Sequence, residues 1–146
     1  MANAARREGQ RVGTVGHPVY SALFPVPVVC FLGTLLTDFA YAKSGGNLLW
    51  LAFSSWLLLA GLLVGAIAAL VLLVDVVRDA AMRLPFGWAH LLFLYAALIV
   101  ELLNIFIHER DGWTAVVPIG MTLSIIGTVL ILVAAWLRPR LVEAVR

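Results

Sequence analysis

Apolar residues fall into long runs that short polar segments separate. The runs extend over residues 18–42, 48–77, 86–107 and 115–137. A helix needs about 20 predominantly apolar residues to cross a bilayer, and each run is long enough. The pattern therefore predicts an all-α integral membrane protein whose four transmembrane helices form an antiparallel bundle. The second run is longer than the bilayer requires, so we expect that helix to tilt or to extend beyond the hydrocarbon.

Short polar segments join the predicted helices. The first, Lys43–Asn47, contains two glycines that tolerate positive φ and an Asn that suits a helix cap. Residues 78–85 and 109–112 form the other two connections. Such short connections make consecutive helices antiparallel neighbours. Residues 17–138 are then the transmembrane domain, between a basic cytoplasmic segment (1–16) and a cytoplasmic tail (139–146).

Composition supports a lipid environment. Of the 146 residues, 63% are hydrophobic and 12% are charged, whereas soluble domains average about 45–50% and about 25%. The few basic residues stand at the ends of apolar runs, which is typical of topology signals and argues against nucleic-acid binding. The single Cys30 excludes an intrachain disulfide.

The basic residues also predict the orientation. Lys43 and Arg110 lie on one side of the predicted bundle, and the other eight of the ten Lys and Arg residues lie on the opposite side: Arg6, Arg7, Arg11, Arg78, Arg83, Arg138, Arg140 and Arg146. Cytoplasmic loops carry an excess of Lys and Arg. Both ends of the chain are therefore predicted to be cytoplasmic.

Small residues recur at four-residue spacing on two of the predicted helices. The second helix carries Gly61, Gly65 and Ala69, and the fourth carries Gly120, Ser124 and Thr128. Such rows allow helix backbones to approach closely in lipid. Packing within the chain is the simpler interpretation, and a homodimer contact is the alternative.

Polar residues of the third helix lie along one face. His90, Glu101, Asn104 and His108 share this face with Leu94 and Ala97, because all of them are three or four residues apart. An ionisable side chain inside a bilayer costs at least a few kcal/mol, so the face should point into the bundle. Its polar members lie at the two ends, and the apolar middle argues against a continuous water path.

The outer end of the predicted bundle brings two acids to a similar depth. Asp38 lies late in the first helix, and Glu101 and Asn104 lie late in the third. If the two acids approach each other, repulsion and desolvation favour a proton on one of them. These three residues are our candidates for a proton or cation site. The alternative is that each acid separately meets Thr34, Thr37, Asn104 or interfacial water.

The inner end contains a second polar group. His17 begins the first helix, His90 lies early in the third, and Asp75 and Arg78 end the second. Two histidines on opposed helices can ligate a haem iron or another metal, and a carboxylate can orient the ring. The alternative is that His17 is an interfacial residue and His90 bonds the backbone or Asp75. Nearby, Pro25 and Pro27 remove backbone donors, which predicts an irregular start to the first helix.

The opening of the chain resembles a known family. Gly16-His17-Pro18-Val19-Tyr20, then Phe24-Pro25-Val26-Pro27 and Thr37-Asp38-Phe39, are similar to the start of a bacterial family of four-helix membrane proteins, the domain of unknown function 2231. Asp75 and His90 match later positions, and the resemblance covers about residues 16–137. The chain departs from the pattern at Tyr20, where the family has a second His, and at Phe93, where it has a polar residue.

The resemblance implies a location and a role. It implies the bacterial cytoplasmic (inner) membrane and, because some members are fused to Rieske iron–sulfur domains, a redox-associated or accessory module. Partners would be membrane redox proteins or a larger membrane complex. The resemblance implies electron transfer or cofactor binding without naming the cofactor. The two opposed histidines, His17 and His90, make b-type haem a candidate cofactor, and Tyr20, Asp75 and Arg78 are the other candidate binding residues.

Two other functions stay open on the residues themselves. One is a proton- or cation-handling membrane protein that uses Asp38, Glu101 and Asn104, and the other is a structural subunit of a larger complex. The sequence contains no phosphate-binding loop, dinucleotide fingerprint, Cys pair or nucleophile elbow. An enzyme is therefore not expected.

Overall fold

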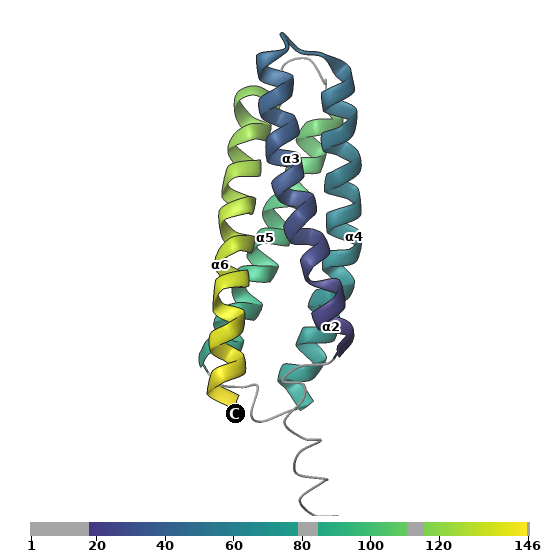
Figure 1. The fold of residues 1–146 in the computed structure, drawn as a ribbon. Coiled ribbons are helices and arrows are strands. Elements are labelled where there is room, and N and C mark those ends of the chain that lie inside the picture. Colours follow the sequence, from purple (N-terminus) through teal and green to yellow (C-terminus); the bar gives the residue numbers. More distant parts are fainter. Residues whose placement is uncertain (1–17, 79–84, 111–115, 146) are drawn as a thin grey trace, which may run out of the picture.

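The computed structural model describes residues 18–78, 85–110 and 116–145, with side chains up to residue 138. Its helices are α2 (Pro18–Leu23), α3 (Pro25–Lys43), α4 (Leu48–Arg78), α5 (Pro85–Glu109) and α6 (Met121–Val145) (Figure 1). A short kinked segment, η2 (Val116–Gly120), precedes α6, and its Val117 is not helical (φ −117°, ψ 120°). Within the described ranges there is no β-strand. The predicted all-α fold is confirmed.

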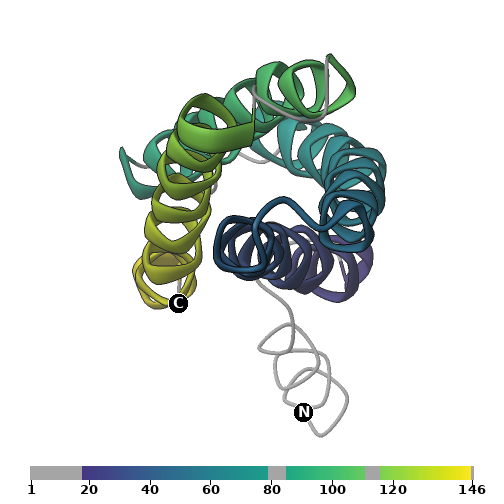
Figure 2. The same ribbon diagram turned by 90° about the horizontal axis from the view of Figure 1, so that it is seen from above.

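The helices form spans that are long and apolar enough to cross a membrane. These spans are Pro18–Lys43, Leu48–Arg78, Pro85–Glu109 and Val116–Arg138, so the prediction of a four-helix membrane protein is confirmed. Seen from above, they form a ring in which α3 packs on α4 and α6, and α5 packs on α4 and α6 (Figure 2). We call the end with the α3–α4 turn the hairpin end, and the end with Pro18 the terminal end.

Prolines interrupt the first span, as the sequence predicts. Phe24 separates α2 from α3, and Pro25 is the first residue of α3. The Phe24 N–H still donates to the Tyr20 carbonyl at 2.9 Å. Pro25 has no N–H with which to continue that hydrogen-bond pattern, so the pattern is interrupted here, although Phe24 keeps helical dihedral angles (φ −57°, ψ −36°). The break lies beside the histidine of the terminal end.

The α3–α4 turn has the chemistry expected of it. Gly45 has φ of 70° and Gly46 has φ of 91°, values that glycine adopts without steric cost. Asn47 accepts a hydrogen bond from the Leu49 N–H at 3.0 Å and so caps α4. The turn fixes α3 and α4 as an antiparallel pair.

The last helix is longer than the hydrophobic run. α6 continues to Val145, past the predicted end at Leu137, so most of the predicted tail is helical. Pro139 lies within this extension, and the residues that follow it, 140–145, contain neither glycine nor proline, so they are compatible with a helix. The predicted start at Ala115 lies outside the described residues.

A layer of apolar side chains fills the middle of the bundle. Phe31, Leu58, Leu94 and Ile131 are completely buried, belong to one core cluster and come from all four spans. Ala97 belongs to the same core cluster and lies on the face of α5 that also carries His90, Leu94 and Glu101. The predicted apolar middle is therefore present, and it separates the polar groups of the two ends.

The small residues allow close packing inside the chain. A Cβ at Gly61 would lie 2.6 Å from Cε1 of Phe31 and 2.9 Å from Cβ of Cys30. A Cβ at Gly65 would lie 2.7 Å from Cδ2 of Leu98. These glycines of α4 thus face α3 and α5, in agreement with the simpler interpretation of their spacing.

Gly61→Ala should destabilise the bundle. The added methyl group would overlap a buried ring, and overpacking of this kind costs about 1–3 kcal/mol. The matched control is Gly33→Ala, whose Cβ would meet only the end of the flexible Leu57 side chain, at 3.0 Å. The measurement is thermal unfolding in detergent. Equal unfolding midpoints for the two variants would contradict the packing described here.

Candidate functional site

Asp38 is the centre of a polar site inside the hairpin end. It is completely buried on α3 and accepts hydrogen bonds from the three other spans. At Oδ1 the donors are Ser54 Oγ of α4, at 2.6 Å, and His108 Nε2 of α5, at 2.9 Å. At Oδ2 the donor is Ser124 Oγ of α6, at 2.5 Å. One carboxylate therefore joins all four spans.

His108 forms a neutral pair with Asp38. Its Nδ1 lies 3.0 Å from the Asn104 carbonyl oxygen, which can only accept, so Nδ1 carries a hydrogen. Its Nε2 faces Asp38 Oδ1 at 2.9 Å. One proton lies between these two atoms. Wherever on that line the proton sits, the pair has no net charge.

A second hydroxyl supports Ser54. Thr37 Oγ1 lies 2.7 Å from Ser54 Oγ. The Thr37 hydroxyl group also lies within hydrogen-bond distance of the Gly33 and Thr34 carbonyl oxygens, so either hydroxyl group could be the donor in its contact with Ser54. Asp38 therefore does not bond Thr37 directly, as one sequence-based alternative proposed. The two side chains are joined through Ser54 of α4.

Glu101 is joined to Asp38 through two intervening side chains. Asn104 Nδ2 donates to Glu101 Oε2 at 2.9 Å and to Ser124 Oγ at 2.8 Å. Ser124 in turn donates to Asp38. The two acids that the sequence places at a similar depth therefore belong to a single hydrogen-bonded site.

Two buried oxygens of this site have no hydrogen-bond partner. They are Oε1 of Glu101 and Oδ1 of Asn104, on residues that are completely buried. The Glu101 carboxyl group lies against Gly127 of α6, where a Cβ would overlap Oε1 and lie 2.5 Å from Cδ. The absence of a side chain at residue 127 therefore makes the space that Glu101 occupies.

We call this group the hairpin cluster: Asp38, Ser54, Glu101, Asn104, His108 and Ser124. The sequence predicts Asp38, Glu101 and Asn104 as site residues, and the spacing along α5 places His108 on the face of Glu101 and Asn104. The small-residue row predicts only a packing role for Ser124, and no sequence pattern predicts Ser54 as a site residue. The signal for Ser54 was a hydroxyl pair, Ser54-Ser55, within an otherwise apolar run.

The terminal end contains a separate and smaller group. His90 is completely buried, and its Nδ1 donates to the Ala134 carbonyl at 2.8 Å. The Tyr20 hydroxyl group is hydrogen-bonded to the other ring nitrogen, Nε2. The guanidinium carbon of Arg138 lies 5.8 Å from the centre of the Tyr20 ring and 5.7 Å from that of Phe24. Tyr20 therefore acts as a partner of His90.

These residues, as placed, do not fit an axial haem ligand. A ligating histidine offers one ring nitrogen to the iron, whereas both nitrogens of His90 are hydrogen-bonded within the protein. His17, the other candidate ligand, lies outside the described residues. Asp75 is half-buried and Arg78 is exposed on α4, and neither is the partner of a His90 ring nitrogen. Among the described residues, no three His, Cys, Asp or Glu side chains form a group that could hold a metal ion.

Comparison with protein families identifies one that spans nearly the whole chain. The family described as predicted membrane protein (DUF2231) matches residues 16–145. The chain belongs to this family. Its description names no activity, cofactor or partner. The comparison with curated proteins found no match, and neither did the comparison with solved structures.

Ser54→Ala should destabilise the protein, and Ser55→Ala should not. The first change removes a donor from a buried carboxylate, which costs about 1–3 kcal/mol. Ser55 is the adjacent residue but only half-buried and outside the hairpin cluster. Chemical or thermal unfolding in detergent measures the difference. Two variants of equal stability would show that Ser54 does not stabilise Asp38.

The purified protein should show no Soret band, even after addition of haem. The physical reason is the occupation of both His90 ring nitrogens by Tyr20 and Ala134. The absorption spectrum of the detergent-purified protein is the measurement. A Soret band that disappears in His90→Ala would contradict this assignment and restore the haem hypothesis.

Proposed function

We propose that this membrane protein handles protons, and that it binds and releases one within the hairpin cluster. The observation that carries the proposal is the Glu101 carboxyl group, which is completely buried and has one oxygen without a partner. Beside it lies the neutral Asp38–His108 pair. Glu101 is thus the one acid of the hairpin cluster whose charge no other group of the cluster balances.

The net charge of the hairpin cluster favours a proton on Glu101. The titratable groups that face one another are Asp38 of α3 and Glu101 and His108 of α5. The described parts of α4 and α6 supply only the hydroxyl groups of Ser54 and Ser124. An ionised Glu101 leaves the cluster with one net negative charge. Burying an unbalanced charge costs several kcal/mol, and a bound proton removes that cost.

The apolar layer supports a site that is open to one side only. Leu94 and Ala97 separate Glu101 from His90 along α5, and both are completely buried. Phe31, Leu58 and Ile131, from the other spans, belong to the same buried core cluster as Leu94 and Ala97. Protons would have to cross this layer to reach the terminal end. Proton binding from the hairpin side is therefore favoured over transmembrane conduction.

The distribution of basic residues supports an orientation for this site. Eight of the ten Lys and Arg residues belong to the terminal side of the sequence pattern. By the positive-inside rule, the terminal end faces the cytoplasm and the hairpin end faces outward. In a bacterial cytoplasmic membrane, the hairpin cluster would exchange protons with the outer aqueous phase.

The family resemblance also implied a redox-associated or accessory role. Among the described residues, His90 has no free ring nitrogen to offer a cofactor. The hairpin cluster, in contrast, has an unpartnered ionisable group. Proton handling is for this reason the function that the geometry favours.

Glu101→Gln should abolish a protonation signal at the hairpin end. In lipid nanodiscs, infrared difference spectra between alkaline and acidic pH should contain a band from a newly protonated buried carboxyl group. This band should be lost in Glu101→Gln, because an amide cannot titrate, and kept in the control Asp75→Asn, which removes an acid near the other end of the bundle.

Two outcomes would contradict the proposal. One is a wild-type spectrum without any titrating carboxyl band, and the other is a band that survives in Glu101→Gln. Proteoliposomes with an internal pH indicator separately test whether the apolar layer blocks proton conduction across the membrane. The wild-type protein should conduct no more protons than empty liposomes, and sustained flux would rule out the closed apolar layer.

A further inference from the structure

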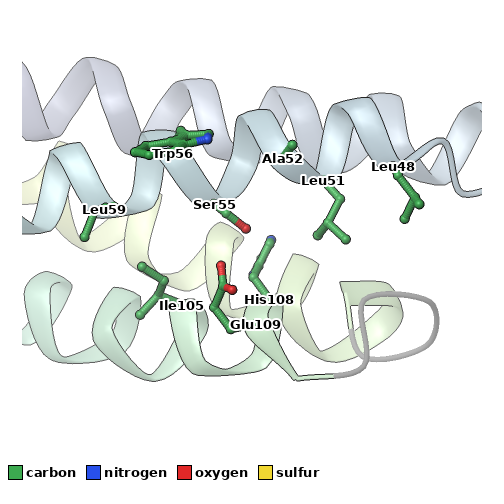
Figure 3. Close-up of a pocket in the computed structure, with 9 residues that line it drawn as sticks. All are labelled: Leu48, Leu51, Ala52, Ser55, Trp56, Leu59, Ile105, His108 and Glu109. Carbon is green, nitrogen blue, oxygen red and sulfur yellow. The ribbon is translucent and has the colours of Figure 1, made fainter.

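A groove lies between α4 and α5 at the hairpin end, next to the hairpin cluster. Its volume is about 720 Å³, and its lining includes Ala52, Ser55, Trp56, Ile105, His108 and Glu109. Figure 3 shows Ser55, His108 and Glu109 with their side chains directed into the space between the two helices. Because α4 begins and α5 ends here, the groove starts at the hairpin end of these two spans.

The same two helices form a second groove deeper in the bundle. It has a volume of about 530 Å³, and Leu59 and Ile105 line both grooves. Apart from Tyr95, every residue that lines the second groove has an apolar side chain. Water needs polar partners to occupy such a space. The first groove offers them and the second does not, so a water-filled region would end near Leu59 and Ile105.

His108 connects the first groove to the hairpin cluster. It lines the groove and donates to Asp38 through Nε2. None of the other members of the hairpin cluster is among the residues that line this groove. The imidazole ring therefore stands between the groove and the buried carboxylate.

We infer that the groove is the entrance through which protons reach the hairpin cluster, with His108 as the group through which they pass. This inference rests on the proposed proton-handling function. Glu109 is exposed at the mouth, where a carboxylate raises the local concentration of protons. His108 is bonded through both ring nitrogens, so the ring must turn before it can exchange a proton with water in the groove.

Filling the groove should slow proton exchange without changing the amount of proton bound. Ala52→Phe places a ring in the first groove, and the matched control Ala66→Phe places the same ring in the second groove, on the same helix. The rate is measured after a rapid pH jump in nanodiscs, from the infrared band of the protonated carboxyl group. We expect Ala52→Phe to slow it about tenfold or more, the effect of roughly 1.4 kcal/mol on a barrier.

The amplitude and the rate of this band separate two kinds of failure. If the wild-type band is absent, the proposed function fails and the entrance fails with it. If the band is present but Ala52→Phe and Ala66→Phe exchange equally fast, the proposed function stands and the entrance is wrong. Should Ala52→Phe not fold, Ser55→Leu fills the same groove. An unchanged rate in that variant would likewise overturn the inference.

Discussion

The structure depends on one carboxylate that accepts hydrogen bonds from three neighbouring helices. Asp38 binds Ser54, His108 and Ser124, which belong to α4, α5 and α6. In lipid, apolar side chains gain little by leaving the surrounding hydrocarbon, so polar contacts and close packing determine how helices associate. Asp38 therefore sets the relative positions of the spans at the hairpin end, while small residues such as Gly61 and Gly65 set the helix separation elsewhere.

The same arrangement divides the bundle into a polar end and a sealed middle. Below Glu101, the side chains that face one another are apolar and completely buried. Below that layer, Tyr20 and Ala134 occupy both nitrogens of His90. The two polar groups therefore do not form one pathway. Both ring nitrogens of His90 are hydrogen-bonded, whereas the hairpin cluster contains the oxygens without partners, and this difference is why we propose proton handling for the hairpin cluster.

Much of this could be predicted from the sequence, because lipid imposes simple rules. Run length identified the four spans, and three- and four-residue spacing placed Glu101, Asn104 and His108 on one inward face. Side-chain partners across helices could not be predicted in this way. Whether Tyr20 or Asp75 reaches His90 depends on helix rotation and on the break at Phe24, and spacing along one helix specifies neither. The role of Gly127 could not be predicted from the sequence either. Gly127 matters because it has no side chain, which leaves space for the Glu101 carboxyl group.

The missing side chain at Gly127 limits which residues this fold can carry beside Glu101. Glu101 lies in a space that exists because α6 presents bare backbone there. The volumes of the side chains at residues 101 and 127 are therefore linked, although the residues belong to different helices. A larger residue at 127 is compatible with this bundle only if the acid at 101 becomes shorter or is lost. Sequence variation at the two positions should accordingly occur in pairs, and a chain that has gained a side chain at 127 will have given up the buried acid.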